Sequence, residues 1–90
     1  MQEEVKIKRK ILCEAVSKTL FELRNSQNKS ISLISDEINL SKTIWADAEK
    51  AEVDMQLSTF WRISEALDIS PEVLILKVKE YLPENFSFLD

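Results

Sequence analysis

The 90-residue chain contains no glycine, no histidine and a single cysteine, and each of these shortages excludes a class of protein. Without glycine it cannot build the Gly-rich loops that cradle phosphates, or the tight turn of dinucleotide-binding folds. Without histidine, and with Cys13 as its lone thiol, it lacks the usual zinc ligands, nucleophile pairs and general base. We therefore expect no enzyme, no metal site, no cofactor and no small-molecule substrate.

The sequence also lacks the signals of exported and membrane proteins. One cysteine cannot form an internal disulfide, and no apolar run approaches the ~18 residues of a membrane span. Residues 1–10 do not resemble a basic and then apolar leader. We expect a reducing, cytoplasmic compartment, no membrane association, and a space-filling role for Cys13.

What is present is a single acidic domain with an uneven distribution of charge. The net charge is −4, but residues 1–24 carry six basic and four acidic side chains, whereas residues 45–90 carry four basic and ten acidic ones. A chain of this size buries only about 60% of its unfolded surface. Every core position therefore contributes noticeably to its stability.

The spacing of apolar residues predicts an all-α fold with five helices. Pro71 and Pro83 are the only two prolines, and no dipeptide favours a hairpin turn. A period of 3.6 residues predicts helices at about 4–25, 31–38, 42–51, 57–67 and 71–82. We expect residues 1–82 to form the domain and residues 83–90 to form a C-terminal tail, which is either associated with a dimer or disordered.

Apolar stripes and capping residues support these helices. The expected core positions are Leu12, Val16, Leu20 and Leu23, then Leu57, Phe60, Ile63 and Leu67, then Leu74, Val78 and Leu82. Ser30, Ser41 and Ser70 are suited to cap helix N-termini, and Asn39 tolerates the left-handed conformation that ends a helix. The second and third helices therefore meet at a sharp corner, which is typical of a helix-turn-helix.

Residues 20–75 resemble the lambda-repressor-like (Cro and phage-repressor, XRE) helix-turn-helix family without a gap. The resemblance is carried by the run Ile34-Ser35-Asp36-Glu37-Ile38-Asn39-Leu40-Ser41-Lys42-Thr43, by Trp45, Ala48 and Glu49, and by Leu57, Phe60, Ile63, Leu67, Ile69, Ser70 and Leu74. It implies a five-helix bundle with the motif at helices two and three. It also implies a buried salt bridge between Arg24 and Glu49 beneath the corner.

The resemblance further implies that the chain is a small prokaryotic or phage transcriptional regulator that binds double-stranded DNA sequence-specifically. Lys42, Thr43 and Asp47 would then contact bases. Phosphate contacts are expected from Ser30, Lys50, Lys10 and Lys29. Such regulators usually pair as homodimers over two half-sites, and helix five with Phe86, Phe88 and Leu89 offers a dimer surface.

Departures from the family pattern leave a second function open. Ile31 stands where the family usually has a phosphate-anchoring Gln, and Ala51 stands where it has Gly. Asp47, Glu52 and Asp54 also place negative charge on the expected contact edge. The alternative is a protein-interaction module or anti-regulator on the same fold, which has lost DNA binding and whose acidic surface engages a basic protein partner.

Overall fold

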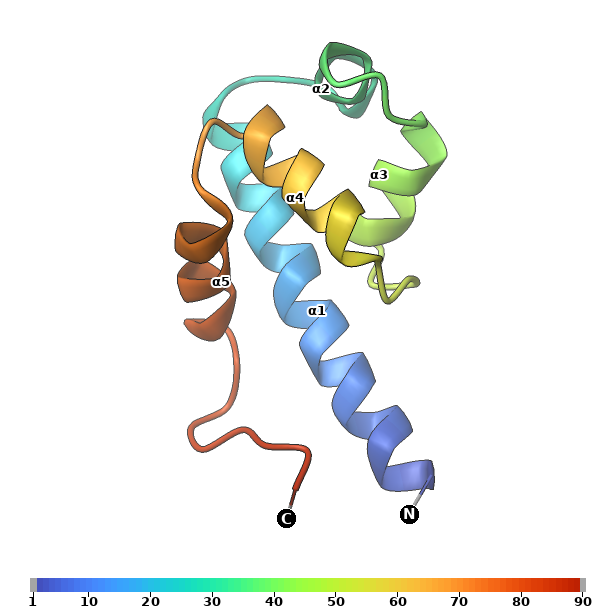
Figure 1. Ribbon diagram of the computed structural model, residues 1–90, viewed down its shortest axis with the longest axis vertical. Helices are drawn as coiled ribbons and strands as arrows, with labels where there is room; N and C mark the ends of the chain where they lie inside the picture. Colours follow the sequence, from blue (N-terminus) through green and yellow to red (C-terminus); the bar gives the residue numbers. More distant parts are fainter. Residues whose placement is uncertain (1, 90) are drawn as a thin grey trace.

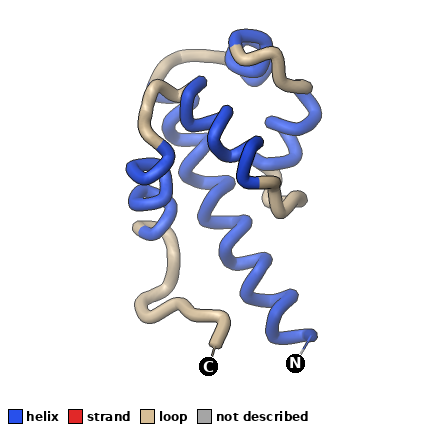
Figure 2. Tube along the Cα trace, viewed as in Figure 1, coloured by secondary structure: helices blue, strands red, loops and turns tan. Residues whose placement is uncertain are grey.

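The computed structural model describes residues 2–89, and its longest element, α1 (Gln2–Ser26), determines the length of the molecule. A helix of 25 residues is about 37 Å long, close to the 39 Å of the longest molecular axis. The shorter helices are α2 (Ile31–Glu37), α3 (Lys42–Glu49), α4 (Leu57–Ala66) and α5 (Pro71–Lys79). The described part contains no strand, so the predicted all-α fold with five helices is confirmed (Figure 2).

The shorter helices gather around the C-terminal half of α1 (Figure 1). α1 packs against α3 on one side and α5 on the other, and α2 and α4 complete the bundle. The core between them consists of Leu20, Ile34, Leu40, Trp45, Ala48, Phe60, Ile63, Leu67 and Leu74. The N-terminal half of α1 extends beyond this core, and both ends of the described chain lie at the same end of the molecule.

The N-termini of the helices follow the predicted capping pattern in two of three cases. Ser30 Oγ accepts a hydrogen bond from Leu33 N at 3.1 Å, and Ser41 Oγ accepts one from Thr43 N at 3.2 Å. Ser70 occupies the cap position of α5, but its side chain makes no capping hydrogen bond, so this part of the prediction is wrong. α5 begins instead on the preset φ of Pro71.

Some predicted helix bounds differ from those of the structure. α1 extends from Gln2 to Ser26, and α3 ends at Glu49 rather than at residue 51. α5 ends at Lys79 rather than Leu82, because the chain loosens into turns in which the N–H groups of Tyr81 and Leu82 bond three residues back. The residue before a proline is disfavoured in the helical region, so Pro83 ends the helix early.

The predicted core is correct for most apolar positions and wrong for Leu57. Leu20, Phe60, Ile63, Leu67, Leu74 and Val78 are buried, whereas Leu12, Val16, Leu23 and Leu82 are half-buried. Leu57 is 74% exposed because it is the first residue of α4 and lies beyond the core edge, which Met55 covers instead. α1 also buries Cys13, Ala15, Thr19 and Arg24.

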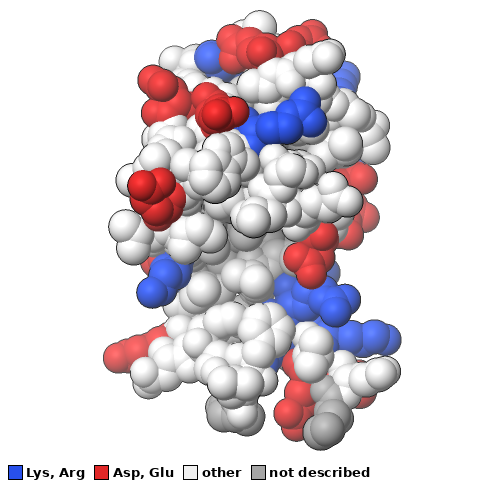
Figure 3. Space-filling model, viewed as in Figure 1, with Lys and Arg blue, Asp and Glu red and all other residues white. Residues whose placement is uncertain are grey.

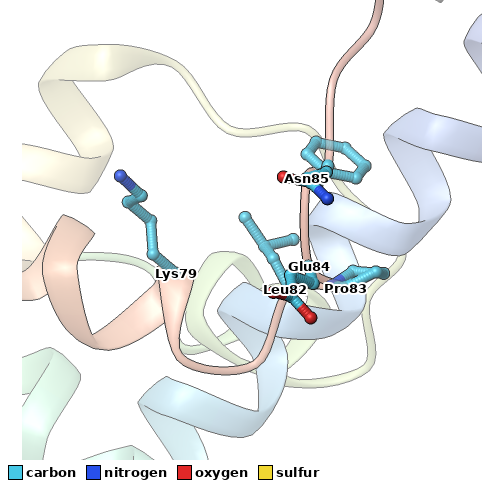
Figure 4. Close-up of a pocket in the computed structure, with 6 residues that line it drawn as sticks. Lys79, Leu82, Pro83, Glu84 and Asn85 are labelled. Atoms are coloured by element: carbon cyan, nitrogen blue, oxygen red, sulfur yellow. The ribbon is translucent and has the colours of Figure 1, made fainter.

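The tail after α5 turns at Pro83 and encloses an open hollow with the end of the helix. Figure 4 shows Lys79 and Asn85 on opposite sides of Leu82 in this hollow. Further along, the rings of Phe86 and Phe88 meet edge to face with centroids 5.5 Å apart. The last residue of the predicted tail, Asp90, and the first of the chain, Met1, lie outside the described residues.

Tyr81 ties the end of α5 to α1. Its hydroxyl donates a hydrogen bond to the Glu22 carboxylate, and this bond raises the pKa of the Tyr81 phenol.

Within residues 2–89, no helix combines the length and apolar character needed to cross a membrane.

Candidate nucleic-acid interface

The corner between α2 and α3 is built on Asn39, which adopts the left-handed conformation with φ of 54°. The chain reverses there, and Leu40 N donates to Ser35 O at 2.9 Å. Leu40 is buried, so it anchors the turn in the core immediately before Ser41 caps α3. As a result, the first turn of α3 lies at the surface, where Lys42 and Thr43 are exposed to solvent.

The opposite side of α3 is fixed by burial. Trp45 is fully buried and Ala48 almost so, as predicted for the inner positions of this helix. The indole N–H of Trp45 donates to Glu49 Oε2 at 2.6 Å, one turn further along. A helix held by a large aromatic ring at its centre has one orientation, and this orientation determines which residues face solvent.

The predicted salt bridge between Arg24 and Glu49 is confirmed. Arg24 Nε lies 2.6 Å from Glu49 Oε2, and Nη2 lies 2.8 Å from Glu49 Oε1, which makes the pair bidentate. The two side chains are only 10% and 7% exposed. The hydrogen bonds that Arg24 donates to Glu49 raise the pKa of the Arg24 guanidinium, which favours its charged form.

This ion pair joins three segments of the chain. Arg24 Nη1 donates to Lys29 O at 2.7 Å, which fixes the loop before α2. Ser17 Oγ donates to Glu49 O at 2.5 Å, which fixes the end of α3 to α1. The buried guanidinium and carboxylate therefore position both helices of the corner relative to α1.

A contact that the sequence pattern does not predict supports the corner from α4. Arg62 Nη2 donates to the carbonyls of Ile38 and Asn39, at 2.8 and 3.0 Å. Arg62 looks like an ordinary exposed residue of α4, and its partners are 23 and 24 residues away in the chain. No local pattern signals such a bond.

Comparison with solved structures identifies the architecture. The chain is similar to the crystal structure of an HTH_3 family transcriptional regulator from Vibrio cholerae, with a TM-score of 0.72 and 22% sequence identity. The chain shares the all-α helix-turn-helix fold of that structure. The match covers 91% of this chain and 46% of the regulator, so the chain spans about half of that protein's length. No family model and no curated protein matches it.

Within the helix-turn-helix fold, the predicted base-contacting residues lie on one helix. Lys42 and Thr43 are exposed in the first turn of α3, and Asp47 is half-buried one turn later. Lys50 is exposed at the C-terminal cap of the same helix. Ile44, which the sequence analysis did not single out, is 40% exposed beside Thr43.

The other predicted phosphate-contacting residues lie apart from α3. Ser30 is exposed at the cap of α2, where its oxygen accepts from Leu33 N and its hydroxyl hydrogen is still able to donate. Lys29 Nζ lies 2.8 Å from Glu37 Oε1, so that carboxylate offsets its charge. Lys10 is exposed on the N-terminal half of α1, seven residues before the Ser17 contact with the end of α3.

Two departures from the family pattern have structural consequences. Ile31 is half-buried and packs against the core, so it offers no donor at the α2 N-terminus. Ala51 takes the left-handed conformation with φ of 60°, and the chain thus keeps the turn for which the family uses Gly. On the acidic edge beyond α3, Asp54 forms an ion pair with Arg9 at 3.5 Å.

Proposed function

We propose that this protein is a small transcriptional regulator that binds double-stranded DNA by placing α3 in the major groove. The observation that carries the proposal is the division of α3 into two faces. One face, with Trp45 and Ala48, is buried and locked by the Arg24–Glu49 pair, while Lys42 and Thr43 face solvent. The similarity of the fold to a transcriptional regulator supports the same function.

The exposed side chains of α3 have the chemistry to contact base edges. Lys42 can donate to the O6 and N7 acceptors of guanine. Thr43 and the neighbouring Ile44 can meet the methyl group of thymine, and Asp47 can accept from the amino group of cytosine. Ser30, Lys50, Lys29 and Lys10 are the proposed phosphate-contacting residues, and no catalytic step is part of this function.

Sequence-specific binding of this kind calls for two copies of the chain. Two half-sites lie one helical turn, about 34 Å, apart on DNA. An exposed apolar face on α4 and α5 supports pairing: Leu57 is 74% exposed, Trp61 51% and Ile75 46%. We propose a homodimer that uses this face, which includes helix five as the sequence indicated. A reducing, prokaryotic cytoplasm is the proposed setting.

The second candidate function is a protein-interaction module on the same fold. Ile31 favours it, because the half-buried side chain removes a donor that would bind phosphate. The ten acidic side chains of residues 45–90 favour a basic protein as the partner. The two candidates differ in one measurable property, the affinity for duplex DNA.

Fluorescence anisotropy of a labelled mixed-sequence duplex tests the proposal. We expect binding at about 50 mM salt that weakens steeply towards about 200 mM, since bound lysines release counterions. Lys42→Glu should weaken binding, whereas Lys18→Glu, with the same change of charge at an exposed position of α1, should not, because Lys18 belongs neither to the proposed DNA contacts nor to the proposed pairing face. No binding by the unaltered protein at about 50 mM salt would refute the proposal and favour the interaction module.

A further inference from the structure

The N-terminal half of α1 carries a basic segment that the bundle does not require. Residues 6–10 read Lys-Ile-Lys-Arg-Lys, four basic side chains within five positions. Ile7 in the same segment is 59% exposed, so this part of the helix has little contact with the core. Figure 3 shows Lys and Arg side chains gathered at the lower right of the molecule, where Figure 1 places this half of α1.

Three of these side chains face the same side of the molecule as α3. Lys6, Arg9 and Lys10 line one open depression together with residues 51–54 of the loop that follows α3. The helical register agrees: at about 100° per residue, Lys6 and Lys10 lie within ~40° of Ser17 and Arg24, which both bond to α3. We call Lys6, Arg9 and Lys10 the basic stripe.

The basic stripe changes the charge of the edge beyond α3. Asp54 on that edge pairs with Arg9 at 3.5 Å, so its negative charge is locally offset. Lys6 and Lys10 add two further positive charges to the same depression, against the single carboxylate of Glu52. The depression therefore has an excess of positive charge, although the chain as a whole is acidic.

We propose that the basic stripe binds the phosphates of the DNA strand that borders the major groove at the C-terminal end of α3. The proposal rests on the proposed function and extends it to a second contact surface. Ser17 marks the end of α3, so Lys10 lies about 10 Å and Lys6 about 16 Å further along α1. The major groove is about 12 Å wide, which is similar to these distances along α1. When α3 lies in the groove, the phosphates that border the groove are therefore within reach of Lys10 and Lys6.

This placement gives α1 a function beyond packing. The C-terminal half of the helix supports the corner through Ser17 and Arg24, and the N-terminal half presents charge to the same ligand. Because both halves belong to one continuous helix, the distance between α3 and the basic stripe is fixed. The phosphate contacts of the basic stripe then position the protein on the duplex, while the side chains of α3 select the bases.

The salt dependence of duplex binding tests the basic stripe. The test variant is Lys6→Gln/Lys10→Gln, and the matched control is Lys18→Gln/Lys77→Gln, which removes two positive charges that line neither the depression beside α3 nor the grooves of the proposed pairing face. Each phosphate contact adds about 0.9 to the slope of log K against log salt. We expect the slope to fall by about 2 in the test variant and to change little in the control.

Each outcome supports or overturns the proposal. The basic stripe is not a contact surface if the test and control variants bind mixed-sequence duplex with equal affinity and slope while Lys42→Glu still weakens binding. That result would leave the proposed function intact. If the unaltered protein does not bind duplex at all, both proposals fail. Binding to vesicles of anionic lipid, without binding to duplex, would also overturn the proposal for the basic stripe and would assign the stripe to a membrane surface.

Discussion

At the scale of single residues, Glu49 connects α3 to α1 at the candidate site. Its carboxylate accepts hydrogen bonds from both Arg24 and Trp45, and its backbone carbonyl accepts from Ser17. The resemblance predicted the bond to Arg24 but not the one to Trp45. The spacing of four residues between Trp45 and Glu49 was an available signal, because side chains so placed on a helix are neighbours.

Removing one partner of the buried ion pair should strongly destabilise the fold. We expect Arg24→Met to lower the free energy of unfolding by about 3 to 5 kcal/mol, since it leaves the Glu49 carboxylate buried without a countercharge. The exposed Arg9–Asp54 pair is the control: Arg9→Gln should cost less than about 1 kcal/mol. Urea unfolding measures both.

A double variant separates the stranded charge from lost packing. Arg24→Met combined with Glu49→Gln removes the buried charge and retains an amide oxygen that accepts from Trp45 Nε1. It should be more stable than Arg24→Met alone. Equal stability of the single and double variants would mean that the cost arises from packing and not from the unpaired carboxylate.

At the scale of the helices and turns, the absence of glycine has a visible consequence. Among residues 2–89, five take positive φ, and none of them is glycine: Asn28, Asn39, Ala51, Asp68 and Asn85. Asn and Asp tolerate this conformation through local hydrogen bonds, whereas alanine has no such compensation. Ala51 therefore holds the end of α3 in a strained turn.

Relief of this strain should stabilise the protein. Ala51→Gly is expected to raise the free energy of unfolding by about 1 kcal/mol, because a left-handed residue with a Cβ costs about 1 to 2 kcal/mol and glycine loses more chain entropy on folding. The control is Ala46→Gly within α3, which should lower the free energy of unfolding by about 1 kcal/mol. Thermal unfolding of the two variants should shift in opposite directions. A destabilising effect of Ala51→Gly would show that the turn is not strained.

At the scale of the whole molecule, charge and apolar surface are segregated. The basic stripe and α3 lie on one side of α1, and uncharged side chains extend across the middle of the face that carries α4 (Figure 3). Leu57 and Ile75 line one groove on this face, between α1, α4 and α5. Exposed apolar surface of this kind in a folded domain marks an interaction site.

The apolar face should mediate pairing of two copies. In a two-fold dimer each residue is buried twice, so Leu57→Lys should weaken dimerisation at least about a hundredfold, given ~1.5 kcal/mol or more per buried leucine. Ile7→Lys, at a residue of similar exposure on α1, should leave dimerisation unchanged. Sedimentation equilibrium over a range of concentrations measures both. A monomeric unaltered protein, or equal dimerisation of the two variants, contradicts the prediction.

The helices, the corner between α2 and α3 and the inner face of α3 could be predicted from the amino-acid sequence. The apolar period acts through neighbouring residues, and so do the capping and turn residues Ser30, Ser41, Asn39 and Pro71. Their effects can therefore be predicted from the local sequence. Features that depend on contacts between distant residues became visible in the folded chain. The exposure of Leu57 depends on Met55 covering the core edge, Arg62 bonds carbonyls 23 and 24 residues away, and the basic stripe faces α3 because α1 packs there in one register. Such positions are set by how helices pack and not by the residues next to them in the chain.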